Sequence, residues 1–135
     1  AGTITAIRSD TKAKLIFTNL VDTDMVYGHR NDCRGYYRCL RDFDRSLPQM
    51  MSALRASDAL FITSDHGCDP TTPGTDHTRE YVPLLVYGPA LRWDVDLGTR
   101  KALADVGQTV LEMLGYSNGR DKRLAGTSFA RQLTE

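Results

Sequence analysis

The sequence is short of cysteine, of net charge and of long apolar runs. Its three cysteines, Cys33, Cys39 and Cys68, are odd in number and show no CxxC spacing, so a disulfide framework is not expected. Basic and acidic residues number 17 each, so no excess of positive charge would attract a nucleic acid or an anionic membrane. No apolar stretch is long enough to span a bilayer. We expect a cytoplasmic protein that binds neither nucleic acid nor membrane.

Histidine is scarce as well, and its distribution is uneven. The chain of 135 residues has 3 histidines, and two of them lie within SDHGCDPTTPGTDHTRE, residues 64–80. A hydrophobic content of 41% and a charged content of 25% are ordinary for a globular protein of one domain. The polar stretch that carries the histidines is therefore the feature that most needs a chemical explanation.

Short apolar runs alternate with polar loops along the first two thirds of the chain. Residues 14–21, 58–65 and 82–88 are rich in β-branched and aromatic residues, which is typical of strands buried on both faces of a parallel sheet. Polar loops follow the first two runs, at residues 22–31 and 64–80. Because ligands of such sheets gather beyond the carboxyl ends of the strands, we expect the two loops to meet at one edge.

Two helices are predicted between and after these runs. Apolar side chains recur every three or four positions over residues 32–54, where Asn31 or Asp32 would be the N-cap and Pro48 would kink or divide the helix. A second helix is predicted over residues 103–114, ending at a glycine, and a short helical turn within the closing GTSFARQL. The alternation of strands and helices indicates an α/β fold.

Aspartates and histidines concentrate where the first two predicted strands end. These candidate metal ligands are Asp24, His29, Asp65, His66 and His77. Five oxygen and nitrogen ligands are more than one tetrahedral metal site uses. They suit two metal ions that lie roughly 3.5–4 Å apart. Carboxylate and imidazole without thiolate favour Mn²⁺ or Zn²⁺ over Mg²⁺ or Ca²⁺. Neighbours on an extended chain point in opposite directions, so Asp65 and His66 bind one ion only if the chain turns at Gly67, and otherwise bind different ions.

These residues also have interpretations that involve no metal. A histidine beside a glycine-rich loop is usually solvated or hydrogen-bonded locally, and Asp65 could simply cap a turn. Asp22 and Asp76 are expected only to orient a neighbouring imidazole. Nothing beside Cys68 would clearly lower its thiol pKa, so we do not expect it to act as a ligand or nucleophile. A metal site is favoured because all three histidines fall in strand-end loops that also contain aspartates.

Several stretches of the chain resemble one known family. FTNLVDTDMVYGHRND and SDHGCDPTTPGTDHTREYVPLLVYGP are similar to segments of the phosphopentomutase family, which is part of the alkaline phosphatase superfamily. ADVGQTVLEMLG and AGTSF resemble later segments of the same family, so the resemblance covers nearly all of residues 15–133. It implies a partial alkaline-phosphatase-like αβα sandwich with a mostly parallel sheet flanked by helices. It also implies that one Mn²⁺ is bound by Asp24, His29 and His77, and a second by Asp65 and His66.

The resemblance implies a transfer of phosphate between the 1- and 5-positions of ribose or deoxyribose. In the family, a phosphorylated threonine donates phosphate to the sugar, giving a bisphosphate, and takes one back from the other end. Two Mn²⁺ ions neutralise the phosphoryl oxygens and activate the threonine. The sequence has no match to the segments with this threonine, one further aspartate ligand and the sugar-binding cap domain. Thr18, Thr63 and Ser64 lie near the proposed site but are not expected to replace the threonine.

We therefore expect residues 1–135 to be the carboxyl-terminal portion of a phosphopentomutase-like catalytic domain, inactive alone, with a pentose phosphate as the substrate of the whole enzyme. Open sheet edges and an apolar face would be covered by the amino-terminal part of the same enzyme or by self-association. Two alternatives stay open. One is another phosphatase or mutase of the superfamily, which CDPTTPGTDHTRE disfavours. The other is a non-catalytic metal-binding or interaction remnant, which the absent nucleophile favours.

Overall fold

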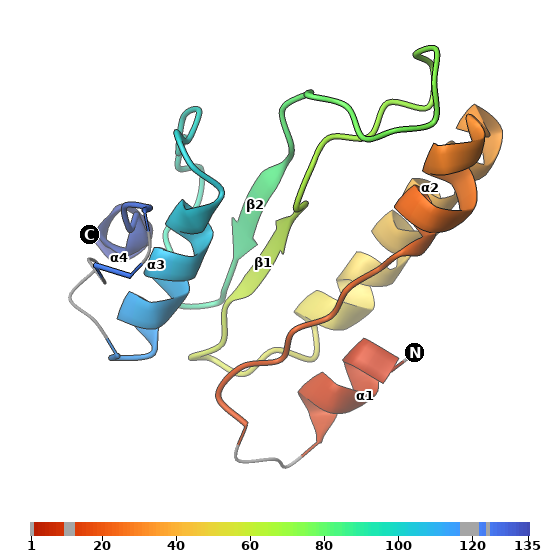
Figure 1. The fold of residues 1–135 in the computed structure, drawn as a ribbon. Coiled ribbons are helices and arrows are strands. Elements are labelled where there is room, and N and C mark those ends of the chain that lie inside the picture. The colour runs from red at the N-terminus through yellow and green to blue at the C-terminus, as the bar shows by residue number, and fades with distance from the viewer. Residues whose placement is uncertain (1, 10–12, 117–121, 124) are drawn as a thin grey trace. The chain divides into compact units, whose positions relative to one another are not determined.

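The computed structural model of the chain describes residues 2–9, 13–116, 122–123 and 125–135. The chain divides into two compact units, Ala1–Pro89 and Ala90–Glu135. Figure 1 labels the helices and strands of each unit. Within the described residues, no helix combines the length and the apolar character needed to cross a membrane.

The first unit contains the longest helix of the described residues, α2 (Cys33–Met51). Of the two predicted N-caps, Asp32 has this role, because its Oδ1 accepts a hydrogen bond from the backbone N–H of Gly35 at 2.9 Å. The helix is continuous through Pro48, so the predicted division does not occur. A shorter helix, α1 (Gly2–Arg8), contacts α2 and was not predicted.

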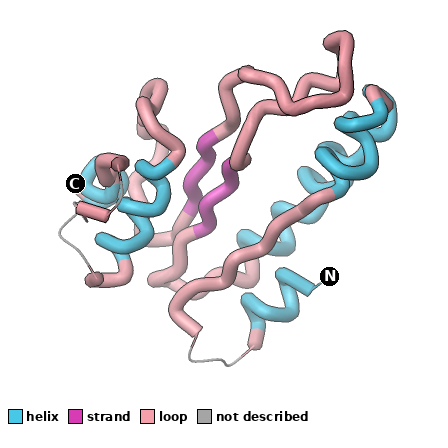
Figure 2. The backbone as a smooth tube through the Cα atoms, in the orientation of Figure 1, coloured by secondary structure: helices cyan, strands magenta, loops and turns pink. Residues whose placement is uncertain are grey.

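The prediction of a strand over residues 14–21 is wrong for this structure. The segment forms neither strand nor helix, and Figure 2 shows it as loop. The side chains of Leu15, Phe17 and Leu20 are exposed, Phe17 to 86%. A strand requires a neighbour to accept and donate its backbone hydrogen bonds, and the described residues of this chain supply none beside the segment. An apolar pattern alone is therefore not enough to form a strand.

The two other predicted strands form, but they pair antiparallel instead of parallel. Strands β1 (Leu60–Thr63) and β2 (Leu84–Tyr87) lie side by side as a two-stranded sheet, with Leu60 opposite Tyr87 and Thr63 opposite Leu84 (Figure 1). Parallel neighbours need a crossover connection, usually a helix. The connection here, residues 64–83, contains no helix and returns the chain antiparallel. The mixed helix and strand content agrees with a partial α/β fold, although this pair is not parallel.

The first unit exposes much apolar surface, as the resemblance led us to expect. Among its described residues, Met50 is the only hydrophobic side chain of the buried core. The exposed apolar side chains near its amino end are Leu15, Ile16, Phe17, Leu20, Val21 and Met25. Exposed apolar side chains that are concentrated in one segment are typical of an interaction site.

The second unit has a closed core built on helix α3 (Ala104–Met113) and the short helix α4 (Ala130–Thr134). Both predicted helical segments are confirmed, and Gly115 follows α3 with a φ of 76°, the left-handed conformation of a helix stop. Phe129 and Leu133 are buried between the helices. The buried hydroxyl of Thr109 donates to the Asp105 carbonyl at 2.7 Å and accepts from the Phe129 N–H at 3.0 Å, so it ties the closing segment to α3.

We predict that Thr109→Val destabilises the second unit by about 1–3 kcal/mol. Valine has nearly the shape of threonine, but it removes a fully buried acceptor and deprives the Phe129 N–H of that bond. The measurement is urea unfolding of the chain followed by circular dichroism. Thr134→Val is the control, since the Thr134 hydroxyl is exposed and bonds only within α4 at 3.3 Å. Equal unfolding midpoints for the two variants would contradict this role for Thr109.

Candidate metal centre

A tight turn places Asp24 and His29 on the same side of the chain. Residues Thr23–Tyr27 form a π-helical turn, η1, in which the N–H of Gly28 bonds the carbonyls of both Thr23 and Asp24. A 3-10 turn, η2 (Gly28–Arg30), follows directly. Asp24 therefore lies in the first turn and His29 in the second, and the two successive turns bring their side chains to within 3.4 Å. The polar segment predicted as a loop is therefore two wound turns.

The long connection between β1 and β2 folds back on itself and presents His77. Gly67 and Thr78 form an isolated antiparallel bridge, in which the Thr78 N–H bonds the Gly67 carbonyl at 3.0 Å. The Thr78 hydroxyl also accepts from the N–H of Asp69 at 2.9 Å. Gly67 is required here, because a Cβ would lie 2.8 Å from the Thr78 carbonyl oxygen and from the Glu80 nitrogen. The closure brings His77 back beside His66.

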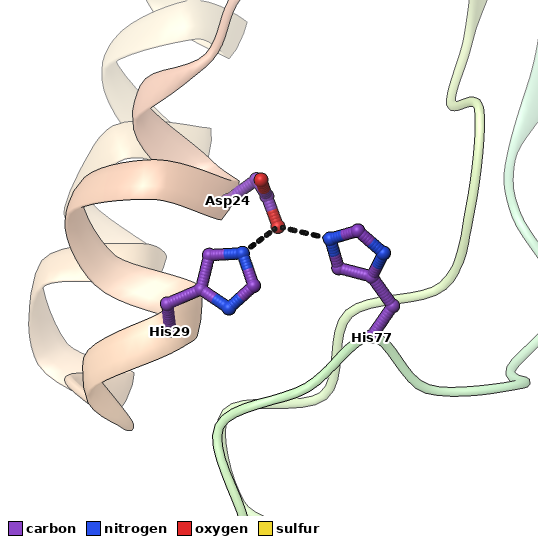
Figure 3. Close-up of side chains that lie close together, drawn as sticks. All are labelled: Asp24, His29 and His77. Carbon is purple, nitrogen blue, oxygen red and sulfur yellow. Dashed lines mark ion pairs between the residues drawn. The ribbon is translucent and has the colours of Figure 1, made fainter.

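Three of the five predicted metal ligands converge on one point. The Oδ1 of Asp24 lies 3.4 Å from the Nε2 of His29 and 3.4 Å from the Nε2 of His77. Figure 3 shows the carboxylate between the two imidazole rings, which come from separate segments of the first unit. One donor atom from each of the three residues falls within 4.8 Å of the others. The side chain of His77 is about half exposed, at 49%, so the cluster is open to solvent on that side.

A backbone carbonyl sets the orientation of the His29 ring. The Nδ1 of His29 is hydrogen-bonded to the carbonyl oxygen of Thr75. A carbonyl oxygen only accepts, so Nδ1 carries the proton, and in the neutral ring Nε2 presents a lone pair toward Asp24. For His29 the orienting group is thus a carbonyl and not the carboxylate of Asp22 or Asp76, which we had expected. Hydrogen bonding of the distal nitrogen is the usual arrangement for an imidazole that binds a metal.

The donor set fits a divalent cation. Metal–ligand distances of about 2.1 Å separate two corners of a tetrahedron by about 3.4 Å, which matches both carboxylate–imidazole distances. The Asp24 Oδ1 is a buried oxygen without a hydrogen-bond partner. A buried carboxylate oxygen that has no hydrogen-bond donor is unfavourable unless a cation lies beside it. Asp24, His29 and His77 are the residues that could bind that cation.

The other two predicted ligands lie next to this cluster but outside it. The His66 ring stacks on the His77 ring, with centroids 3.6 Å apart and planes 17° apart. Asp65 is 80% exposed, and its Oδ1 lies 3.7 Å from the His66 Nε2. The chain bends at Asp65 and His66, just before Gly67, yet the Asp65 carboxylate is not among the donor groups that cluster with Asp24, His29 and His77. Among the described residues, Asp65 and His66 thus form a separate pair of donors.

The phenol and thiol groups near the cluster stay protonated at neutral pH. Burial, followed by the negative charges of Asp24, Asp69 and Glu80, raises the pKa of Cys68. Burial, followed by the charges of Cys68 and Asp24, raises the pKa of Tyr36. A raised thiol pKa disfavours a nucleophilic or ligating thiolate, as the sequence indicated for Cys68. The Cys68 sulfur instead packs against Gly28, where a Cβ would approach it to 2.4 Å.

The chain is similar to proteins of a known superfamily. The model of the metalloenzyme superfamily matches residues 2–118, which is most of the chain. The chain belongs to the metalloenzyme superfamily. This membership and the cluster of Asp24, His29 and His77 together indicate a metal cofactor.

Curated relatives of this superfamily member are named phosphopentomutase. The relative from Carboxydothermus hydrogenoformans is 62% identical over 105 residues, covering 78% of this chain and 27% of the relative. The relative from Caldanaerobacter subterraneus subsp. tengcongensis is 57% identical over 122 residues, covering 90% of this chain and 30% of the relative. A third, from Acetivibrio thermocellus, is 56% identical over 115 residues. The chain thus spans less than a third of the length of these relatives.

We predict that Thr71→Val raises the pKa of Asp69 in the loop that presents His77. The Thr71 hydroxyl and N–H both bond the Asp69 carboxylate, at 2.7 and 2.8 Å, and lower its pKa. A lowered folded-state pKa stabilises the loop above the ordinary Asp pKa, and this contribution is lost as pH falls through the folded value. Valine removes the hydroxyl and keeps the N–H, so the pKa rises only part of the way. Carbon-13 NMR titration measures it, and an unchanged Asp69 titration would contradict the assignment.

Proposed function

We propose that the chain is part of a phosphopentomutase, which interconverts the 1-phosphate and 5-phosphate of ribose or deoxyribose. The observation that carries this proposal is the identity of 53–62% to phosphopentomutases across most of the chain, together with the aspartate–histidine cluster. Carboxylate and imidazole without thiolate suit Mn²⁺, which we propose as the cofactor. A bound cation pair would neutralise phosphoryl oxygens and lower the pKa of an attacking hydroxyl.

Each of the five residues has a proposed role in this centre. Asp24, His29 and His77 would hold one ion, and Asp65 and His66 would contribute to the second. The position of Asp65 supports this division, because its carboxylate is exposed and lies 3.7 Å from the His66 Nε2, outside the cluster of Asp24, His29 and His77. The half-exposed His77 leaves an opening through which a phosphate could approach. The nucleophilic threonine and the cap domain that binds the sugar would come from parts of the enzyme outside these residues.

The activity is tested on the complete protein that contains this chain, supplied with Mn²⁺ and ribose 1-phosphate. We expect ribose 5-phosphate to form without net release of phosphate. Asp24→Asn should lower kcat/KM by at least about 100-fold, because it removes charge from the centre that stabilises the transferring group. Release of inorganic phosphate would indicate a phosphatase of the same superfamily instead. The absence of any turnover would indicate a metal-binding or interaction module.

We predict that Asp24→Ala and His77→Ala weaken Mn²⁺ binding far more than Asp76→Ala does. Loss of a ligand should exceed the 10–100-fold effect typical of residues that only orient ligands, so we expect a weakening beyond about 100-fold. Asp76 is the matched control, since it is the exposed neighbour of His77 and lies outside the cluster. Isothermal titration calorimetry of the chain gives the affinities. Equal effects of all three variants would refute the assignment.

We propose that the apolar segment of residues 14–21 packs against the amino-terminal part of the same enzyme. Its side chains are exposed in the first unit, and it leads directly into the turn with Asp24. Burying one large apolar side chain stabilises a structure by roughly 1.5–3 kcal/mol, so this surface is a strong site for packing.

We predict that Phe17→Ser lowers the binding of the apolar dye ANS by the isolated chain, because Phe17 is exposed among apolar neighbours. Tyr81→Ser is the control, since Tyr81 is equally exposed, at 89%, but follows the charged Arg79 and Glu80. In the complete protein, dye binding should fall to the level of an ordinary globular enzyme. If the complete protein bound as much dye as the chain, the segment would have another role.

A further inference from the structure

Three side chains from the turn after Gly28 connect it to the loop that presents His77. They are alternate residues, and their acceptors are backbone carbonyls that follow in reverse order along the loop. The contacts are His29 Nδ1 to Thr75 O, Asn31 Nδ2 to Thr72 O at 2.8 Å, and Cys33 Sγ to Pro70 O at 3.2 Å. The turn and the loop therefore run past each other in opposite directions, fastened at three points.

Asn31 is the central contact and also shapes the turn. Its backbone has φ 53° and ψ 29°, a left-handed conformation that asparagine adopts more readily than most other residues. The N–H of Asn31 donates to the carbonyl of Gly28 at 3.0 Å, and η2 ends at this residue. The next residue, Asp32, is the N-cap of α2. Asn31 thus ends the turn that carries His29 and donates a hydrogen bond to the loop that carries His77.

The closure of the loop does not by itself bring His77 to Asp24. The bonds among Gly67, Asp69 and Thr78 fasten the loop only to itself. The 3.4 Å separation between His77 and Asp24 depends on contacts that cross from the loop to the turn. Among the three crossing donors, His29 belongs to the metal cluster and the thiol of Cys33 is a weak donor. Of these three donors in the described residues, the amide of Asn31 is the strong one that lies outside the cluster.

We propose that Asn31 is a positioning residue for the metal centre. By bonding the Thr72 carbonyl, it holds His77 at the distance from Asp24 and His29 that a shared cation requires. The inference rests on the proposed function, because it assumes that these three residues bind a metal ion. Asn31 acts through the backbone of the loop and makes no contact of its own with the cation. Its loss should therefore weaken and distort the site without removing a ligand.

Two variants separate the side chain of Asn31 from its backbone. Asn31→Gly retains the left-handed conformation and removes the amide, whereas Asn31→Ala removes the amide and also strains the backbone. The matched control is Arg30→Ala. Arg30 is the exposed neighbour of Asn31, and its side chain bonds the carbonyls of Val26 and Met25, which lie in the preceding turn η1 and not in the loop that presents His77. Mn²⁺ affinity of the 135-residue chain is measured by calorimetry, and the thermal midpoint is measured without metal.

We expect both Asn31 variants to bind Mn²⁺ about 10-fold more weakly than the unmodified chain, as is typical when a residue that supports ligands is lost. Arg30→Ala should bind normally. Without metal, Asn31→Gly should melt only slightly below the control, because it loses one exposed hydrogen bond, and Asn31→Ala should melt lower still because its backbone is also strained. With Co²⁺ as the probe, the visible absorption bands of Asn31→Gly should differ from those of the unmodified chain, because the ligand geometry has changed.

Different results overturn different parts of the argument. If the unmodified chain bound neither Mn²⁺ nor Co²⁺, the metal centre and the role of Asn31 would both fail. If the unmodified chain bound Mn²⁺ and Asn31→Gly bound it equally well, only the positioning role would fail. A third result would also overturn the proposal. Asn31→Gly would bind Mn²⁺ more weakly, but its metal-free stability would fall by as much and its Co²⁺ spectrum would be unchanged. Asn31 would then be a purely structural residue.

Discussion

The structure of the first unit depends on what balances the negative charge of one buried carboxylate oxygen, the Oδ1 of Asp24. The Oδ1 of Asp24 has no hydrogen-bond donor and faces the nitrogens of His29 and His77 at 3.4 Å. Without a cation, this oxygen is buried with no compensating donor, which is unfavourable. A divalent cation bound as we propose would compensate it. Such a cation would couple binding to folding in this unit, because it would stabilise the π-helical turn and the closed loop that bring the three side chains together.

Local signals in the sequence predicted the helices and the chemical type of the site. The apolar period and the Asp32 cap predicted α2, and a glycine stop predicted the end of α3. Aspartate and histidine beside apolar runs pointed to metal chemistry, because few other functions combine these side chains. Such signals succeed where a residue and its partner are close in sequence. They also succeed for residue types whose chemistry is rare elsewhere in the chain, as histidine is here.

The features that sequence reasoning missed depend on distant partners. Residues 14–21 have the composition of a strand, but a strand exists only beside another strand. The antiparallel pairing of β1 and β2 is set by a helix-free connection, whereas apolar runs look alike in either direction. The carbonyl of Thr75, which orients His29, belongs to the backbone and leaves no residue type to detect. Asn31 offered one weak signal, since asparagine before a helix cap often adopts a left-handed conformation. The sequence alone suggested it as a cap instead.

The two units treat their buried carboxylate groups differently. The difference indicates which contacts must fix the positions of the candidate metal ligands. In the second unit, Asp105 is buried but satisfied by the guanidinium of Arg100 and the N–H of Thr127. Among the described residues of this unit, Phe129, Ala130 and Leu133 are also buried. In the first unit, by contrast, the Oδ1 of Asp24 is buried without a hydrogen-bond partner and the apolar segment of residues 14–21 is exposed.

The apolar segment leads directly into the turn that contains Asp24, so a partner that covers the segment would also restrain Asp24. Because His77 reaches the cluster from a separate loop, an ion bound as we propose would have to align two independently held segments. Covering the apolar segment would fix one of them, and the Asn31 bond would fix the other against it.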